Sequence, residues 1–165
     1  MKKIIVSILL LLPLGLVAQE MKIALVNTQD IINVMPEVGV METEMLAMRQ
    51  QYQKEAQIME DEYNRKFADF TAQNDSLTDN IRKLRIQEIE SIRDRLQNFV
   101  PMAQETIEAK QNELLAPIYD KLQKAIDSVG EEQGYMCIMN PQAFLYKGKG
   151  LIDATEQVKA KLGLK

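Results

Sequence analysis

Residues with the chemistry for catalysis are few in this chain. Gly148, Lys149 and Gly150 suggest a phosphate-binding loop, but the full pattern G-x-x-x-x-G-K-[ST] is absent and Leu151 follows the second glycine. The chain has no histidine, the commonest general base and metal ligand, so its serines have no imidazole to activate them. The carboxylates lack the spacing of a calcium loop. We therefore expect no catalytic residue, no metal site and no cofactor, and we predict that the protein is not an enzyme.

Cys137 is the only cysteine, so no disulfide can form within the chain. It lies in an apolar run, where a free cysteine usually behaves as a small hydrophobic side chain. We expect Cys137 to be buried rather than reactive.

The N-terminus has the pattern of a secretory signal peptide. Two lysines precede an apolar run over residues 4–16, and residues 16–18 (LVA) form a small-residue cleavage context. Pro13 and Gly15 interrupt the run, which is too short for a good membrane span. An uncleaved anchor is the alternative. We predict a cleaved signal peptide and a periplasmic protein whose mature chain begins at Gln19.

The mature chain is acidic. The full chain has 20 basic and 24 acidic residues, and removal of Lys2 and Lys3 leaves 18 basic residues. Nucleic-acid binding depends on clustered Lys and Arg that neutralise phosphates. We expect no nucleic-acid partner.

The middle of the chain has the periodicity of amphipathic helices. Over residues 40–70 and again over residues 81–129, apolar positions recur at spacings of three and four that repeat every eleven residues. This repeat of about 3.67 residues per turn is close to that of a straight α-helix, so two such helices can run side by side. Residues 71–80 are polar and predict a reversal. The pattern therefore predicts an antiparallel helical hairpin, roughly 70 Å long at about 1.5 Å per residue.

Five residues predict the boundaries and bends of these helices. Pro36 and Gly39 mark an elbow before the first long helix. Pro101 and Pro117 each remove a backbone hydrogen bond, and because the apolar stripe keeps its phase across both, they predict kinks within one helix. Gly130 is expected to end that helix.

The two ends of the chain predict short strands and short helices. Residues 22–27 (KIALVN) are expected to form a strand, with a brief helix after it that stops before Pro36. Residues 135–139 and 143–147 predict two strands joined as a tight hairpin, and residues 152–162 predict a terminal helix. The fold class is α+β, with a small β-barrel-forming body and a long helical arm. The domains are the signal peptide (1–18), the body (19–36 and 130–165) and the arm (37–129, with its tip near 71–80).

The predicted strands are apolar on both faces. Three strands of five or six residues cannot cover both faces and satisfy their own edges, so copies of the same subunit are expected to complete the sheet. The alternative is a monomeric sheet covered only by its two small helices. The residues expected in the oligomerisation core are Ile23, Leu25, Val26, Met136, Ile138, Phe144 and Tyr146.

The arm carries more apolar residues than a solvated two-helix hairpin needs. Methionine side chains adapt to varied partners, and the chain has ten of them. These residues either fill contacts within the hairpin or form a binding surface for varied partners. The candidates are Met41, Met45, Met48, Leu77, Leu84, Ile86, Phe99 and Met102.

Residues 22–27 (KIALVN) and 134–162 (GYMCIMNPQAFLYKGKGLIDATEQVKAKL), together with the signal peptide and the long hairpin, resemble the Skp (OmpH) family of periplasmic chaperones. The resemblance implies a homotrimer in which three strands per subunit form a nine-stranded barrel and three arms surround a cavity. It also implies a holdase that binds unfolded outer-membrane β-barrel proteins without ATP. The alternative is a structural or adaptor coiled-coil protein of the cell envelope.

The charge of this chain departs from that family. Its familiar enterobacterial members are strongly basic, with positive arm tips that meet anionic lipid, whereas this chain is acidic. The basic residues near the predicted tip, Arg82, Lys83 and Arg85, lie among acidic neighbours. Charge-mixed helices usually present solvated faces, so we expect a solvated tip, and contact of the tip with a membrane surface is the alternative.

Overall fold

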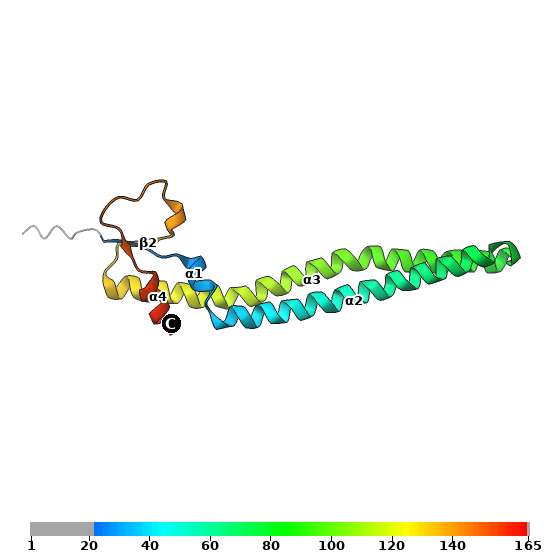
Figure 1. Ribbon diagram of the computed structural model, residues 1–165, viewed down its shortest axis with the longest axis horizontal. Coiled ribbons are helices and arrows are strands. Elements are labelled where there is room, and N and C mark those ends of the chain that lie inside the picture. The colour runs from blue at the N-terminus through cyan, green and yellow to red at the C-terminus, as the bar shows by residue number, and fades with distance from the viewer. Residues whose placement is uncertain (1–21, 165) are drawn as a thin grey trace, which may run out of the picture.

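The computed structural model describes residues 22–164, and the predicted signal peptide lies outside this range. The chain forms a small body at one end and a long arm that leaves it (Figure 1). The elements in chain order are β1 (Ile23–Leu25), α1 (Thr28–Ile32), α2 (Pro36–Gln73), a 3₁₀ turn (Asn74–Ser76), α3 (Asp79–Gln133), β2 (Cys137–Met139), a second 3₁₀ turn (Pro141–Ala143), β3 (Ile152–Asp153) and α4 (Thr155–Lys161).

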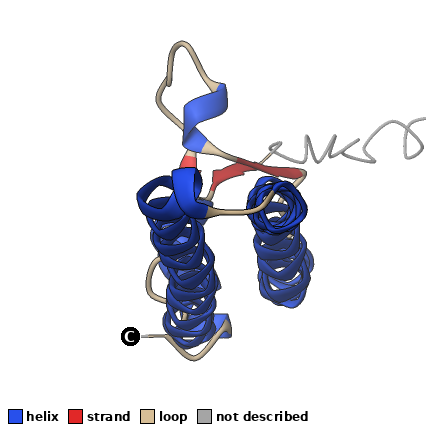
Figure 2. Ribbon diagram, turned by 90° about the vertical axis from the view of Figure 1, so that its right-hand side faces the viewer, coloured by secondary structure: helices blue, strands red, loops and turns tan. Residues whose placement is uncertain are grey.

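The arm confirms the predicted antiparallel helical hairpin. Helices α2 and α3 contain 38 and 55 residues, and Figure 2 looks along the arm and shows them as two separate columns. Helix α2 begins at Pro36, because the first residue of a helix has no use for a backbone N–H. Gly39 therefore lies within the helix and not at an elbow. Helix α3 is continuous through Pro101 and Pro117 and bows gradually in Figure 1.

The expectation that Gly130 ends the long helix is wrong. Helix α3 continues to Gln133 and is capped by Gly134, which has a φ of 65°, in the left-handed region that suits glycine. Gly130 stays helical, and a Cβ at this position would lie 3.5 Å from the Cδ1 of Ile138. Gly130 therefore allows β2 to lie close to the helix.

The expected hairpin of residues 135–139 and 143–147 is also wrong. The sheet has the order β2-β1-β3, and both outer strands run parallel to β1. After β2, the side chain of Asn140 accepts a hydrogen bond from the backbone N–H of Gln142, which starts a 3₁₀ turn in place of a tight reversal. Residues 143–147 contain no strand, and β3 follows later. The connection is long because parallel strands cannot be joined by a tight turn.

Side-chain hydrogen bonds tie the carboxyl ends of the three strands together. The backbone N–H of Asn27, after β1, donates to the hydroxyl of Thr155 at 3.0 Å. The side-chain amide of Asn140, after β2, donates to the hydroxyl of Thr28 at 3.1 Å. The carboxylate of Asp153 accepts from the N–H of Thr155. The hydrogen bond from the side chain of Thr155, followed by the one from its backbone, holds the pKa of Asp153 below the usual value. These contacts join segments from opposite ends of the chain into one body.

The core lies between the inner face of the sheet and the helices α1, α3 and α4. Its buried residues come from β1 and the residue after it, from α1 and the segment before α2, from the C-terminal part of α3, and from α4 with the residue before it. They are Ala24, Val26, Ile31, Met35, Ile118, Leu122, Ala125, Val129, Ala154 and Val158. The base of the arm is thus part of the packing that stabilises the body. The predicted terminal helix is confirmed as α4, although it begins at Thr155 and Ile152 belongs to β3.

Only part of the predicted apolar stripe is buried. Met45, Ile89, Ile92 and Ala103 are buried between α2 and α3. Other stripe positions remain exposed, and Val100 is 54% exposed. A seam between two helices is narrow, because each helix has only one neighbour to pack against. The arm therefore keeps apolar side chains at its surface.

Candidate functional site

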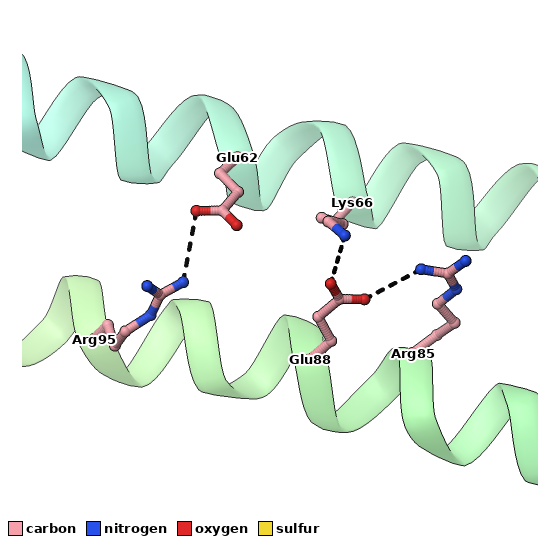
Figure 3. A network of polar contacts seen from close by, with 5 residues as sticks. All are labelled: Glu62, Lys66, Arg85, Glu88 and Arg95. Atoms are coloured by element: carbon pink, nitrogen blue, oxygen red, sulfur yellow. Dashed lines mark hydrogen bonds and ion pairs between the residues drawn. The ribbon is translucent and has the colours of Figure 1, made fainter.

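Four ion pairs link the two helices of the arm along its length. Glu37 pairs with Lys121 and Glu44 with Lys110 near the body, whereas Glu62 pairs with Arg95 and Lys66 with Glu88 farther out. Figure 3 shows the outer network, in which the carboxylate of Glu88 is shared by Lys66 and Arg85. Pairs this exposed contribute little energy each, because water and salt screen them. Their regular placement favours one register of α2 against α3.

The basic residues predicted at the arm tip do not form one cluster. Arg85 lies 3.2 Å from Glu88, and Arg82 donates from Nη2 to the carbonyl of Leu77 at 3.4 Å. Lys83 is exposed. The hydrogen bond from Lys66, followed by that from Arg85, holds the pKa of Glu88 below its usual value. A hollow of about 90 Å³ beside this network is lined by charges of both signs. The tip has no patch of a single charge at these residues.

Several apolar side chains of the arm point to solvent. Among the predicted binding residues, Leu84 is 60%, Met102 49% and Ile86 39% exposed. Met41, Met48, Leu77 and Phe99 are half-buried, and Phe99 packs against Tyr52 with ring centroids 5.8 Å apart. Met45 is 3% exposed and packs within the hairpin. The sequence prediction did not single out Val40, Ile58 and Phe67, which are more than half exposed.

The sheet has one covered face and one open face. Ala24 lies opposite Ile138 and Ile152 in the neighbouring strands, and both isoleucines pack against the core. The alternate residues Ile23, Leu25, Cys137 and Met139 face the other side, and of these only Leu25 is buried. The loop of residues 140–151 stands on this open side, away from the helices (Figures 1 and 2).

The expectation that Cys137 is buried is wrong, because it lies on the open face and is exposed. The other residues predicted for oligomerisation divide between the two sides. Val26 belongs to the core, and Leu25 is 8% exposed. Ile23 and Phe144 are half-buried, whereas Met136 is 68% and Tyr146 83% exposed. Leu145, which was not predicted, is fully exposed. The open side of the body therefore presents exposed apolar residues, together with Lys147 and Lys149 of the loop.

An apolar groove of about 360 Å³ lies where the arm joins the body. Residues 37, 40, 41 and 44 of α2 and residues 114, 117, 118 and 121 of α3 line it, each set on one face of its helix. The groove was not predicted from the sequence. The i, i+3, i+4, i+7 spacing in both helices was a detectable signal, but it does not distinguish a filled seam from an open one.

A metal-binding cluster and a membrane-spanning helix are both absent from residues 22–164. Within residues 22–164, no group of three or more Cys, Asp and Glu residues could hold a metal ion. No helix in this range is apolar over enough length to cross a bilayer.

The fold and its surfaces define a class of protein in which a long helical hairpin, apolar in places, extends from a small α+β body. The chain belongs to the family of outer membrane proteins described as OmpH-like, whose family model matches residues 22–162. The recognition made from the two terminal segments is thereby confirmed.

A solved structure shows the same fold. The crystal structure of a candidate outer membrane chaperone (OmpH-like) from Caulobacter crescentus CB15 matches with a TM-score of 0.74 and 14% sequence identity. The match covers 85% of this chain and 82% of that chain. None of the curated proteins compared with this chain is a significant match.

Proposed function

We propose that this protein is an ATP-independent holdase chaperone that binds unfolded outer-membrane proteins between its helical arms. The observation that carries the proposal is the exposure of Leu84, Ile86 and Met102 on an arm that has only its own partner helix to pack against. Such side chains lose contact with water only when another molecule covers them. Burial of their apolar surface then stabilises the complex by about 25 cal/mol per Å². Family membership and the chaperone description of the Caulobacter protein support the same function.

We also propose that the working form is a homotrimer. In a single chain, β2 and β3 are both edge strands and the face with Ile23, Cys137 and Met139 is open. Edge strands with free backbone groups beside an apolar face favour pairing with further strands. Three copies would join their sheets into a nine-stranded barrel and direct three arms around a shared cavity.

The proposed location is the periplasm. The N-terminal lysines, the apolar run and the cleavage context support export, and they lie outside the described residues. An unfolded outer-membrane protein has to cross this compartment before it reaches its membrane.

The holdase function can be tested by light scattering. An unfolded outer-membrane β-barrel protein is diluted out of denaturant with or without the purified mature protein, in the absence of ATP. The proposal expects scattering to fall as the chaperone is raised to about one trimer per client. Undiminished scattering, together with stable binding to a folded envelope protein, would favour the adaptor function instead.

The trimer can be tested by the molar mass in solution. Met139→Asp combined with Tyr146→Asp places charges on the open side of the body, where both residues are exposed in one chain, so the subunit should still fold. The proposal expects a mass of one subunit for this variant and three for the wild type. Val100→Asp, on the exposed side of the arm, is the matched control and should stay trimeric. A wild-type monomer would contradict the trimer.

A further inference from the structure

The loop after β2 contains a segment, residues 144–150, whose backbone has no partner in its own chain. The segment stands on the open side of the sheet, away from the helices (Figures 1 and 2). Within the range 22–164, no hydrogen bond joins its backbone to any other residue. Backbone N–H and C=O groups without a protein partner depend on water. The segment therefore keeps its main-chain groups open to pairing with another chain.

The first four residues of this segment have the character of a β-strand. Residues 144–147 are Phe, Leu, Tyr and Lys, and aromatic residues favour strands because they pack well on a pleated surface. The backbone at Phe144 is already extended, with a φ of −103° and a ψ of 129°. Leu145 is fully exposed and Tyr146 is 83% exposed, so their own chain covers neither side chain. These four residues have the composition of a strand but no neighbour to pair with.

The outer edge of β2 is the better of the two edges that the sheet offers. Because β1 is the central strand, β2 and β3 each have one edge without a partner among the described residues. β2 has three residues and exposes Cys137 and Met139. β3 has two residues, and its Asp153 accepts a hydrogen bond from Thr155. The edge of β2 thus gives an added strand more backbone groups and more apolar surface.

A second copy of this chain supplies the strand that this edge lacks. Within one chain, the 3₁₀ turn of Pro141–Ala143 follows β2 directly, and residues 144–147 do not return to pair with it. Every copy has the same unpaired segment and the same edge, so the segment of one copy can meet the edge of the next. Such a head-to-tail contact forms a closed ring when the rotation between neighbouring copies allows closure.

We propose that residues 144–147 of one subunit form a strand that pairs with the outer edge of β2 in the next subunit. Addition of a strand to an open edge satisfies main-chain groups of both chains, and the alternate side chains fix the register. The exposed side chains of the segment then pack beside Cys137 and Met139 of the neighbouring copy. This inference rests on the proposed homotrimer and names the segment and the edge that join its subunits.

The first test uses Cys137, the only cysteine of the chain, to detect the pairing. Four variants of the mature protein place a second cysteine in the segment, and they are Phe144→Cys, Leu145→Cys, Tyr146→Cys and Lys147→Cys. Opposite residues on neighbouring strands have Cα atoms about 4.5–5.5 Å apart, which is within the range of a disulfide. After mild oxidation, we expect at least one variant to run as a covalent trimer on a non-reducing gel. The wild type has one cysteine per chain and cannot link more than two copies.

The control and the contrary results concern the same gel. Lys149→Cys is the matched control, because Lys149 is exposed in the same loop but lies outside the paired residues, and it should give little covalent trimer. A monomer with both thiols consumed would show that the segment returns to β2 of its own chain, and would overturn the proposal. Absence of covalent trimers in all four variants would overturn it as well.

Hydrogen exchange tests the pairing in the wild-type protein, without a substitution in the segment. Residues 144–147 should exchange their amide hydrogens at once in a single chain, because no described residue accepts a bond from them. Along one edge of a strand, only alternate residues donate to the neighbour, so we expect about two of the four amides to be protected in the wild type. The variant that combines Met139→Asp with Tyr146→Asp should lose this protection.

The exchange result separates this inference from the proposed trimer. A wild type that has the mass of three subunits but no protection at residues 144–147 would refute this inference and leave the trimer intact. A wild-type monomer would contradict both. Protection that develops only after an unfolded client is added would show that the segment pairs with clients in place of other subunits, and would also overturn the proposal.

Discussion

Leu84 offers the most direct test of client binding by the arm. It is 60% exposed on α3, and its replacement by serine removes apolar surface without opening a cavity. Full burial of a leucine side chain is worth about 1.5–3 kcal/mol, so a client that covers the exposed 60% of Leu84 gains about 0.9–1.8 kcal/mol. At about 1.4 kcal/mol per tenfold change, Leu84→Ser should weaken client affinity by about five- to twentyfold.

The assay is a titration of a fluorescently labelled, unfolded outer-membrane protein with the chaperone. Leu84→Met keeps the apolar volume and should bind within about twofold of the wild type. Urea unfolding of Leu84→Ser should agree with the wild type within about 0.5 kcal/mol, because surface substitutions away from packed contacts rarely change stability more.

Two results would refute this reasoning. If Leu84→Ser unfolds like the wild type and binds the client with unchanged affinity, the exposed apolar residues of the outer arm do not hold the client. If Leu84→Met loses as much affinity as Leu84→Ser, the effect depends on the shape of leucine and not on its apolar area.

Three further predictions concern the stability of the arm. Ile92→Ala should lower the free energy of unfolding by about 2–5 kcal/mol, because Ile92 is 2% exposed. Ile58→Ala, at a position that is 58% exposed, should change this free energy by less than about 0.5 kcal/mol. Equal losses for the two variants in urea unfolding would contradict the packing described between α2 and α3. Gly39→Ala should stabilise the protein by about 0.5–1 kcal/mol, because Gly39 lies within a helix and a Cβ there would meet no atom within 4 Å. Gly134→Ala should destabilise the protein by about 1–2 kcal/mol, because the φ of Gly134 is 65°. Because the pKa of Glu88 is lowered in the folded protein, its ion pairs stabilise the fold above the pKa of the unfolded chain. This stabilisation is lost as the pH falls through the pKa of the folded protein. Thermal unfolding should therefore show a smaller loss of stability on acidification for Glu88→Gln than for the wild type.

The helical arm was predictable because its signal is local. Each apolar residue of the stripe lies three or four positions from the next, and the helix repeat alone brings them to one face. Met45, Ile89 and Ile92 lie within the two ranges where these spacings recur, and all three are buried. The two prolines did not break the prediction, because α3 retains its phase across both.

The sheet was predictable only as a set of short strands. Residues 137–139 do form a strand, but the choice between an antiparallel hairpin and a parallel pairing depends on β1, more than a hundred residues earlier. The exposure of Cys137 and the position of Gly130 follow from that pairing. Neither residue carries a local pattern that reveals which face of the sheet the helices cover.

The sequence by itself determined the helical hairpin, its reversal within residues 71–80 and the membership in a family marked by both terminal segments. Periodicity and local turn chemistry act over a few residues, so they can be read directly from the order of the side chains. Only the tertiary structure decided the parallel sheet, the open face with Cys137 and Met139, and the groove between Val40 and Pro117. Those features depend on how segments that are distant in the sequence pack in space. The groove in particular stays open because the contact between two helices is too narrow to cover every apolar residue that they present.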